Sequence, residues 1–292
     1  STDAGATWTL LSASSTADFQ YVNRIVVSRG NSSRIYAATR TGILSSRDGG
    51  ATWARSVSAP YYGCVDLAAR NDATVDYLYA VCSGATGNDT FAVYRNSDAS
   101  GAGTWTSVFT APNMGRSVIA IAPSLQTTIY VAAAGNPASP RDGSGIAGVF
   151  RSTSSGDPGS WTTQAAPTGS NPFNYLLFGA ASSASSYCSN GATVANTGGT
   201  WGKMLAVDPV NPNRVWVGGV DLFRSDDGGV NWGVASRWDD QTVPGYAHAD
   251  RHGLIFDPGY NGTTNQIAYH LTDSGVFKTL NAAAAVSSGA RA

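Results

Sequence analysis

The sequence predicts an all-β fold, a β-propeller built from repeated four-stranded antiparallel sheets. Three observations carry this prediction. The composition is poor in helix-forming residues, an eight-residue motif recurs along the chain, and the same order of short apolar segments precedes most copies of the motif.

The composition favours strands and excludes several functions. The chain has 292 residues, its 19 acidic residues are all Asp, and it contains 34 Gly. Because Gly, Asp, Asn, Ser and Thr are poor helix formers, long helices are not expected. A mechanism that needs a glutamate is excluded. The net charge of -1 gives no field that would attract nucleic acid, and no apolar run is long enough for membrane insertion.

The recurring motif, called the box below, runs from a Ser to a Trp. Clear copies span residues 1–8, 46–53 and 225–232, and looser copies end at Trp105 and Trp161. The Trp residues that end successive copies of the box are 45, 52, 56 and 71 positions apart. A period of about 40 to 50 residues is typical of propeller blades. The longest interval indicates an inserted loop, predicted over residues 162–200.

Three short apolar segments form a set in each repeat. Runs of four to eight residues bounded by Gly, Asn, Asp or Pro indicate strands joined by tight turns. The predicted sets are 24–28, 34–39 and 42–46; 64–69, 77–82 and 92–96; 118–122, 129–133 and 148–152; 204–208, 215–219 and 222–225; and 253–257, 266–270 and 275–279. With a short fourth strand after the box, about five blades are expected.

The box is predicted to form the turn between the third and fourth strands. Its Asp accepts hydrogen bonds from turn N–H groups, its Gly supplies positive φ, and its Trp buries a ring beside a neighbouring sheet. The predicted structural residues are Asp3, Trp8, Asp48, Trp53, Asp98, Trp105, Asp227 and Trp232.

These copies closely resemble the Asp-box, or BNR repeat, of sialidases, sortilin-type receptors and family 74 xyloglucanases. The resemblance implies that the boxes lie at the blade periphery, away from the ligand face. Residues 204–279 also resemble the first half of long exported bacterial Asp-box proteins. We therefore expect residues 1–292 to be a single propeller domain or part of one, and favour a fragment of a longer chain. If the chain instead forms a closed five-bladed ring, residues 8–12 pair beside residues 275–279.

The cysteines bear on the cellular location of the protein, because a disulfide would indicate an oxidising compartment. Cys64 begins the first strand of its set and Cys82 ends the second, so antiparallel pairing would bring them opposite one another at a spacing that suits a disulfide. The alternative is two small buried hydrophobic residues. Cys188, in the inserted loop, is either free or bonded outside this chain. An extracellular or cell-surface location is expected.

The densest polar segment contains His248, Asp250 and His252. In an extended chain these three side chains share a face and Arg251 points away. The interpretations are a structural hydrogen-bond network, a ligand contact or a metal triad. The network is favoured, and no metal or cofactor is expected.

Acidic residues near strand ends are the weak catalytic candidates: Asp66, Asp221, Asp250 and Asp273. A glycosidase needs two carboxyl groups about 5 to 9.5 Å apart, a distance that sequence does not supply. Asp208 and Asp257, each followed by Pro, are expected in turns. A sialidase is disfavoured, because that family pairs a Tyr nucleophile with a Glu and this chain has no Glu.

Aromatic residues in the connections between repeats offer stacking surfaces: Tyr61, Tyr62, Phe173, Tyr175, Trp238 and Tyr246. They either contact a ligand or pack the loops. We expect an extracellular module that binds a polysaccharide or a protein, with His248, Asp250, His252, Trp238 and Tyr246 as ligand residues. The alternative is a xyloglucanase-like glycoside hydrolase that uses two Asp on the channel face.

Overall fold

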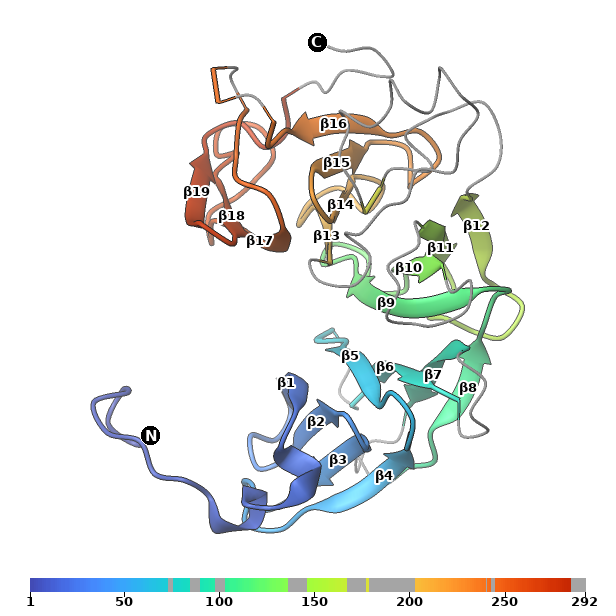
Figure 1. The fold of residues 1–292 in the computed structure, drawn as a ribbon, viewed down its shortest axis with the longest axis vertical. Coiled ribbons are helices and arrows are strands. Elements are labelled where there is room, and N and C mark those ends of the chain that lie inside the picture. The colour runs from blue at the N-terminus through green and yellow to red at the C-terminus, as the bar shows by residue number, and fades with distance from the viewer. Residues whose placement is uncertain are drawn as a thin grey trace. The chain divides into compact units, whose positions relative to one another are not determined.

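The structure, a computed structural model, describes residues 1–72, 76–84, 90–97, 103–135, 146–166, 177–178, 203–239, 241–242 and 245–284. Within this part, the regular elements are β-strands and two short 3₁₀ turns, η1 (Ser12–Ser14) and η2 (Ala17–Phe19). The strands form five antiparallel sheets, four of four strands and one of three, which confirms the all-β prediction (Figure 1). The described residues contain no helix long and apolar enough to cross a membrane.

The chain divides into two compact units, of which the first comprises Ser1–Asn88 and Ala92–Val108. Its sheets are β1 (Val22–Val27), β2 (Ile35–Thr39), β3 (Gly42–Ser46) and β4 (Ala54–Ser58), then β5 (Cys64–Ala69), β6 (Leu78–Ser83), β7 (Phe91–Asn96) and β8 (Thr106–Phe109). Tyr36, Ile43, Leu67 and Leu78 belong to the apolar core between them.

The second unit comprises Asp89–Phe91 and Phe109–Ala292. Its strands are β9 (Met114–Ile121), β10 (Ile129–Gly135), β11 (Ile146–Ser152) and β12 (Thr162–Ala165); β13 (Met204–Val207), β14 (Val215–Gly218), β15 (Leu222–Ser225) and β16 (Gly233–Ser236); and β17 (Arg251–Phe256), β18 (Ala268–Thr272) and β19 (Gly275–Thr279). Val149, Val217 and Phe223 lie in the core between its first two sheets, and Trp216 and Leu254 between the last two.

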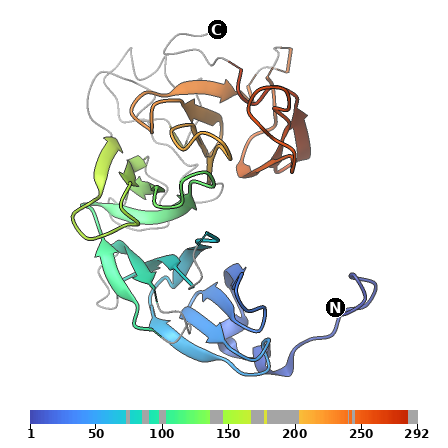
Figure 2. The same cartoon turned by 180° about the vertical axis from the view of Figure 1, so that it is seen from behind.

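Each sheet has its strands in chain order, so its turns and connections lie at two opposite ends. Because neighbouring strands are antiparallel, the turns between first and second strands lie at the same end of the sheet as the box turns. This end of the strands is called the box edge. The second-to-third turns and the connections to the next sheet share the opposite edge, called the connection edge. Within the units, β1 contacts β5, and β13 contacts both β9 and β17, so first strands lie beside first strands as in propeller blades (Figure 2).

All the predicted strands are present, together with a fourth strand after four of the boxes. The largest difference is β9, which begins at Met114 rather than 118 because Met114 pairs with Gly135 beyond a register shift that leaves one extra residue in β9. The inserted loop was predicted from residue 162, but Thr162–Ala165 forms β12 and most of the loop lies outside the described residues. Residues 8–12 form no strand, and their pairing with residues 275–279 stays a prediction.

Candidate functional site

The box edge has a local hydrogen-bond pattern. Thr52 donates to Asp48 through its backbone N (2.8 Å) and its hydroxyl (2.6 Å), and Gly50 N donates to Ser46 Oγ (2.8 Å). Hydrogen bonds from Thr52 and Ser46 lower the pKa of Asp48 to about 2. The Asp is therefore an ionised acceptor that closes the turn, as the sequence predicts.

The other two clear boxes repeat this geometry. Asp3 accepts from Thr7 N and Thr7 Oγ1, and Asp227 accepts from Asn231 N and Asn231 Nδ2. The Thr7 hydrogen bonds lower the pKa of Asp3 to about 2. Asp98, the corresponding residue predicted for a looser box, lies outside the described residues. In these three boxes the Asp side chain builds the turn.

Burial of the box Trp depends on the neighbouring sheet. Trp232 is 2% exposed and belongs to the core between β9–β12 and β13–β16, whereas Trp8 is 81% exposed. Trp53 is partly buried against the edge of Phe19, and Trp105 packs against the core of the first unit. The predicted burial thus holds for Trp232 and is wrong for Trp8, whose local turn is formed without a covering sheet.

The predicted ligand and catalytic residues lie at or next to the connection edges of their sheets. Asp66 is in β5, Asp221 lies in the β14–β15 turn, and Asp273 lies in the β18–β19 turn. The remaining residues, Trp238, Tyr246, His248, Asp250 and His252, lie in the connection from β16 to β17 or at the start of β17.

In the first unit, the connection edge is held by a disulfide and an ion pair. Cys64 pairs with Cys82 in the ladder between β5 and β6, and their sulfur atoms are bonded, which confirms the predicted disulfide. Asp66 is buried, and its Oδ1 accepts a hydrogen bond from Arg24 Nε at 2.9 Å. The carboxylate of Asp66 is therefore ion-paired with an arginine of β1.

In the second unit, Asp221 and Arg251 form a fully buried pair. Trp238 N donates to Asp221 Oδ1 at 2.9 Å, and Arg251 Nη2 lies 3.8 Å from the same oxygen and 3.3 Å from Ser236 Oγ. Burial lowers the pKa of Arg251 to about 10, while Asp221 and Asp250 act in the opposite direction. The guanidinium stays charged at neutral pH. The hydrogen bond from Trp238 N to Asp221 joins the β16–β17 connection to the β14–β15 turn.

The one-face cluster of His248, Asp250 and His252 is not formed. Asp250 has φ of 62°, in the left-handed region, so the extended alternation on which the prediction depends is interrupted before β17 begins. His252 Nε2 pairs with Asp273 Oδ1, while His248 Nδ1 lies 3.2 Å from the carbonyl oxygen of Ala249. Among the described residues, no group of three or more His, Cys or Asp side chains could hold a metal. Arg251 does point away from His252, into the core.

Trp238 and Tyr246 are the aromatic residues of the β16–β17 connection. Trp238 is 43% exposed although its backbone is fixed by Asp221. Tyr246 lies edge-on to Phe277, at 6.2 Å between ring centroids, and forms a parallel bridge with Arg237. The connection therefore presents an exposed ring on a fixed backbone. Tyr61 is also exposed, whereas Phe173 and Tyr175 lie outside the described residues.

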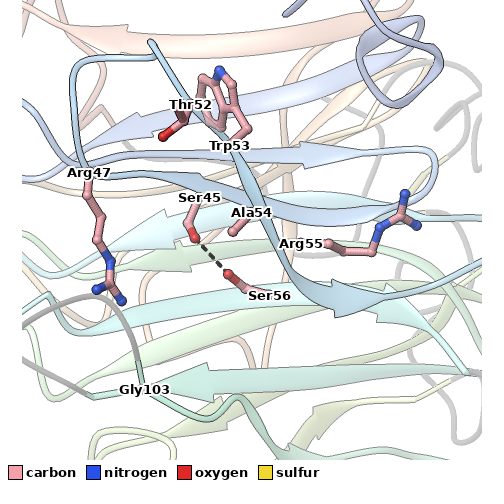
Figure 3. Close-up of a pocket in the computed structure, with 8 residues that line it drawn as sticks. All are labelled: Ser45, Arg47, Thr52, Trp53, Ala54, Arg55, Ser56 and Gly103. Carbon is pink, nitrogen blue, oxygen red and sulfur yellow. Dashed lines mark hydrogen bonds between the residues drawn. The ribbon is translucent and has the colours of Figure 1, made fainter. Parts of the chain in front are cut away.

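A pocket of about 430 Å³ lies on the outer strands of the first sheet, beside the second box. In Figure 3, a hydrogen bond between Ser45 and Ser56 lies between Arg47 and Arg55, whose side chains extend in opposite directions. The lining residues are Ser45, Arg47, Thr52, Trp53, Ala54, Arg55, Ser56 and Gly103. None of them carries a carboxylate or an imidazole, so the pocket offers hydrogen bonds and positive charge but no acid–base pair.

No family model and no curated protein matches the sequence. Three similar solved structures are a GH74 enzyme from Niastella koreensis (TM-score 0.60, 20% identity, 90% of this chain and 37% of that chain), the GH74 xyloglucanase from Xanthomonas campestris (0.55, 18%, 89% and 36%) and YCF48 from Cyanidioschyzon merolae (0.52, 16%, 96% and 75%). The fold is a β-propeller. At such identities the likeness shows the fold alone, and the propeller chain spans little more than a third of either GH74 enzyme.

Proposed function

We propose that this chain is an extracellular propeller module of the Asp-box type that binds a polysaccharide through the connection edge of its second unit. The observation that carries the proposal is Trp238, an exposed ring whose backbone is anchored by the buried Asp221–Arg251 pair. Sugar rings present apolar C–H faces that stack on such aromatic platforms, and a fixed platform loses little entropy on binding.

Polar groups at the connection edge of the last sheet suit hydroxyl recognition. His252 and Asp273 form an exposed pair, so an imidazole and a carboxylate are available to exchange hydrogen bonds with a ligand. The buried Asp221 fixes the loop and is not itself part of the binding surface. The connection edge thus combines an apolar plane with polar donors and acceptors, as carbohydrate sites require.

Binding is favoured over hydrolysis by the partners of the candidate acids. A glycosidase needs one carboxyl group that keeps its proton as a general acid. Asp66 is bonded to Arg24, Asp221 to Trp238 N beside Arg251, and Asp273 to His252, so these three carboxylates already have partners within the fold. Extracellular location is supported by the Cys64–Cys82 disulfide, since disulfides persist in oxidising compartments.

Glycoside hydrolysis is the second candidate function. It is favoured by the likeness to two GH74 enzymes, one of which is a xyloglucanase. Among the described residues, Asp250 is the candidate acid whose side chain has no hydrogen bond or ion pair, and Arg251 acts on it through a Coulombic interaction. A hydrolytic role would therefore centre on Asp250.

The test is binding to a panel of soluble polysaccharides, including xyloglucan, with release of reducing sugar measured on the same samples. We expect retention of at least one polysaccharide without turnover, and at least tenfold weaker binding by Trp238→Ala, which corresponds to about 1.4 kcal/mol. Tyr61→Ala, an exposed aromatic residue of the first unit, is the matched control and should bind normally. Turnover abolished by Asp250→Asn would establish the hydrolase instead. Binding that is absent, or unchanged in Trp238→Ala, would contradict the proposal.

A further inference from the structure

The pocket beside the second box opens where two serines of the first sheet meet (Figure 3). Ser45 is in β3, and Ser56 is the extra residue of β4 at the register shift between these two strands. Such a bulge redirects the side chains of its strand. The two hydroxyl oxygens lie 2.8 Å apart, and the pocket that the serines line has a volume of about 430 Å³.

Long side chains stand at the corresponding positions of the sheet β9–β12. Arg151 is the penultimate residue of its third strand, as Ser45 is, and Gln164 is the extra residue of β12 at the same register shift. Both side chains reach the box that follows. A Cβ added to Gly228 would lie 2.6 Å from Arg151 Nη1, and one added to Gly229 would lie 3.2 Å from Gln164 Cβ. Arg151 and Gln164 therefore close the space between their sheet and the next box.

The serine in β3 also departs from the last two sheets. In the last three sheets, the penultimate residue of the third strand is a cation that lies over the aromatic residue paired with it in the second strand: Arg151 over Tyr130, Arg224 over Trp216 and Lys278 over Tyr269. In the first sheet the residue paired with Tyr36 is Ser45. The pocket thus occupies a space that a long cationic side chain fills elsewhere in the chain.

The walls of the pocket are held by contacts within the first unit. Gly103 lines the side formed by the next box, and Asn96 Nδ2 donates to its carbonyl oxygen at 2.7 Å. Trp53 lines the opposite side. Its Nε1 donates to Gly50 O at 3.1 Å, and Phe19 lies edge-on to its ring at 4.8 Å between centroids. Because the walls are fixed in this way, a ligand orders few groups when it binds.

The lining groups suit a ligand that carries several hydroxyl groups. Ser45 and Ser56 share one hydrogen bond, so one of their two hydroxyl hydrogens remains available to donate. Arg47 is exposed and adds N–H donors, and Trp53 adds an apolar ring. The charge of Arg47 disfavours a second cation in the pocket. The volume is in the range of small-molecule sites and exceeds what a lone carboxylate group fills.

We propose that this pocket is a second saccharide site, which takes one sugar residue of a glycan. Sugar hydroxyls exchange hydrogen bonds with Ser45, Ser56 and Arg47, and an apolar C–H face of the sugar packs against Trp53. The inference goes beyond the proposed function, because the pocket lies in the first unit and does not need Trp238.

Filling the pocket with the side chains that the sheet β9–β12 carries tests the site. The full chain with Trp238→Ala is mixed with glucose, galactose, mannose and xylose, and saturation transfer from protein to sugar is measured by NMR. We expect transfer to at least one sugar, and its loss when Ser45→Arg and Ser56→Gln are added together. Ser58→Gln, at an exposed position of β4 outside the pocket lining, should change nothing. Transfer to none of the four sugars, or equal transfer with the pocket filled, would overturn the inference.

A second variant keeps the pocket open. Arg47→Gln changes an exposed side chain and should weaken binding of the same sugar about tenfold, the effect of losing a hydrogen bond from a charged donor. This variant decides the matter if the filled variant does not fold, as judged by thermal unfolding. Unchanged affinity in Arg47→Gln would overturn the site, and transfer to acetate with none to the sugars would overturn the assignment to a saccharide.

The inference and the proposed function fail in different ways. If polysaccharide binding depends on Trp238 while no sugar responds to filling of the pocket, the pocket site is wrong and the proposed function stands. If sugar binding is lost when the pocket is filled but no polysaccharide binding depends on Trp238, the pocket site stands and the proposed function is wrong.

Discussion

Aspartate has different roles at the two edges of these sheets. At the box edge, the partners of Asp48 are Ser46 and Thr52, within four residues of it. At the connection edge, Asp66 pairs with Arg24, which is 42 residues away, and Asp221 accepts from Trp238, which is 17 residues away. The box turns are therefore built by local hydrogen bonds, whereas Asp66 and Asp221 are held by contacts that exist only in the folded chain. The first kind stabilises turns, and the second kind positions the residues proposed to meet ligand.

The boxes themselves separate local from tertiary effects. Boxes 1–8 and 225–232 form the same turn hydrogen bonds, yet Trp8 is exposed and Trp232 is buried. The backbone of Gly229 approaches Gln164 and Val149 of the neighbouring sheet, so a sheet covers this box. Turn formation thus needs only the local sequence, whereas the stabilisation due to the Trp needs a neighbouring sheet.

The largest effect should come from removing the buried ring. Trp232→Ala deletes a fully packed side chain and should lower the free energy of unfolding by about 3 to 5 kcal/mol, because it leaves a cavity in the core. Trp8→Ala should change it by less than about 0.5 kcal/mol, as is usual for exposed sites. Urea denaturation of both variants measures the difference. Equal losses would mean that the box Trp acts through its turn and not through the neighbouring sheet.

A smaller loss is expected at the connection edge. Asp221→Ala leaves Arg251 charged and buried without its carboxylate, which should cost about 3 kcal/mol. Asp273→Ala, which removes an exposed partner of His252, should cost less than about 1 kcal/mol. Thermal unfolding of the two variants checks this order. A harmless Asp221→Ala substitution would show that the pair does not anchor the connection.

The smallest effect concerns the ionised box aspartates and is lost in acid. The pKa of Asp48 is lowered from 3.8 to about 2 in the folded chain, so its stabilising contribution is present above about pH 4 and is lost as the pH falls towards 2. Asp48→Asn, which keeps an acceptor but cannot ionise, should be less stable than the parent at pH 6 and should approach it near pH 2. Unfolding curves across this pH range measure the difference in stability between the two proteins. A constant difference would refute the stabilising role of the ionised Asp48 carboxylate.

The same distinction explains what the sequence could predict. The strands were predictable because apolar runs and turn residues are local, and the box turns because Ser46, Asp48 and Thr52 are close together in the chain. The Cys64–Cys82 disulfide followed from the strand pairing. The burial of Trp232 and the exposure of Trp8 could not be distinguished, since their motifs are nearly the same.

The site was less predictable for the same physical reason. Strict alternation would place His248, Asp250 and His252 together, but the left-handed conformation of Asp250 redirects the chain. Asp tolerates this conformation without requiring it, so the residue type alone does not predict it. The Asp221–Arg251 pair joins residues from different sheets.

The central claim, that polysaccharide binds the second unit at its connection edge and not at its box edge, is tested most directly by hydrogen exchange with and without a bound polysaccharide. The account predicts slower exchange on binding for backbone amides in residues 219–221 and 245–252 of the second unit. It predicts unchanged exchange for the box turn at residues 226–232 of the same unit. Protection confined to residues 226–232, with none in residues 219–221 and 245–252, would contradict the account.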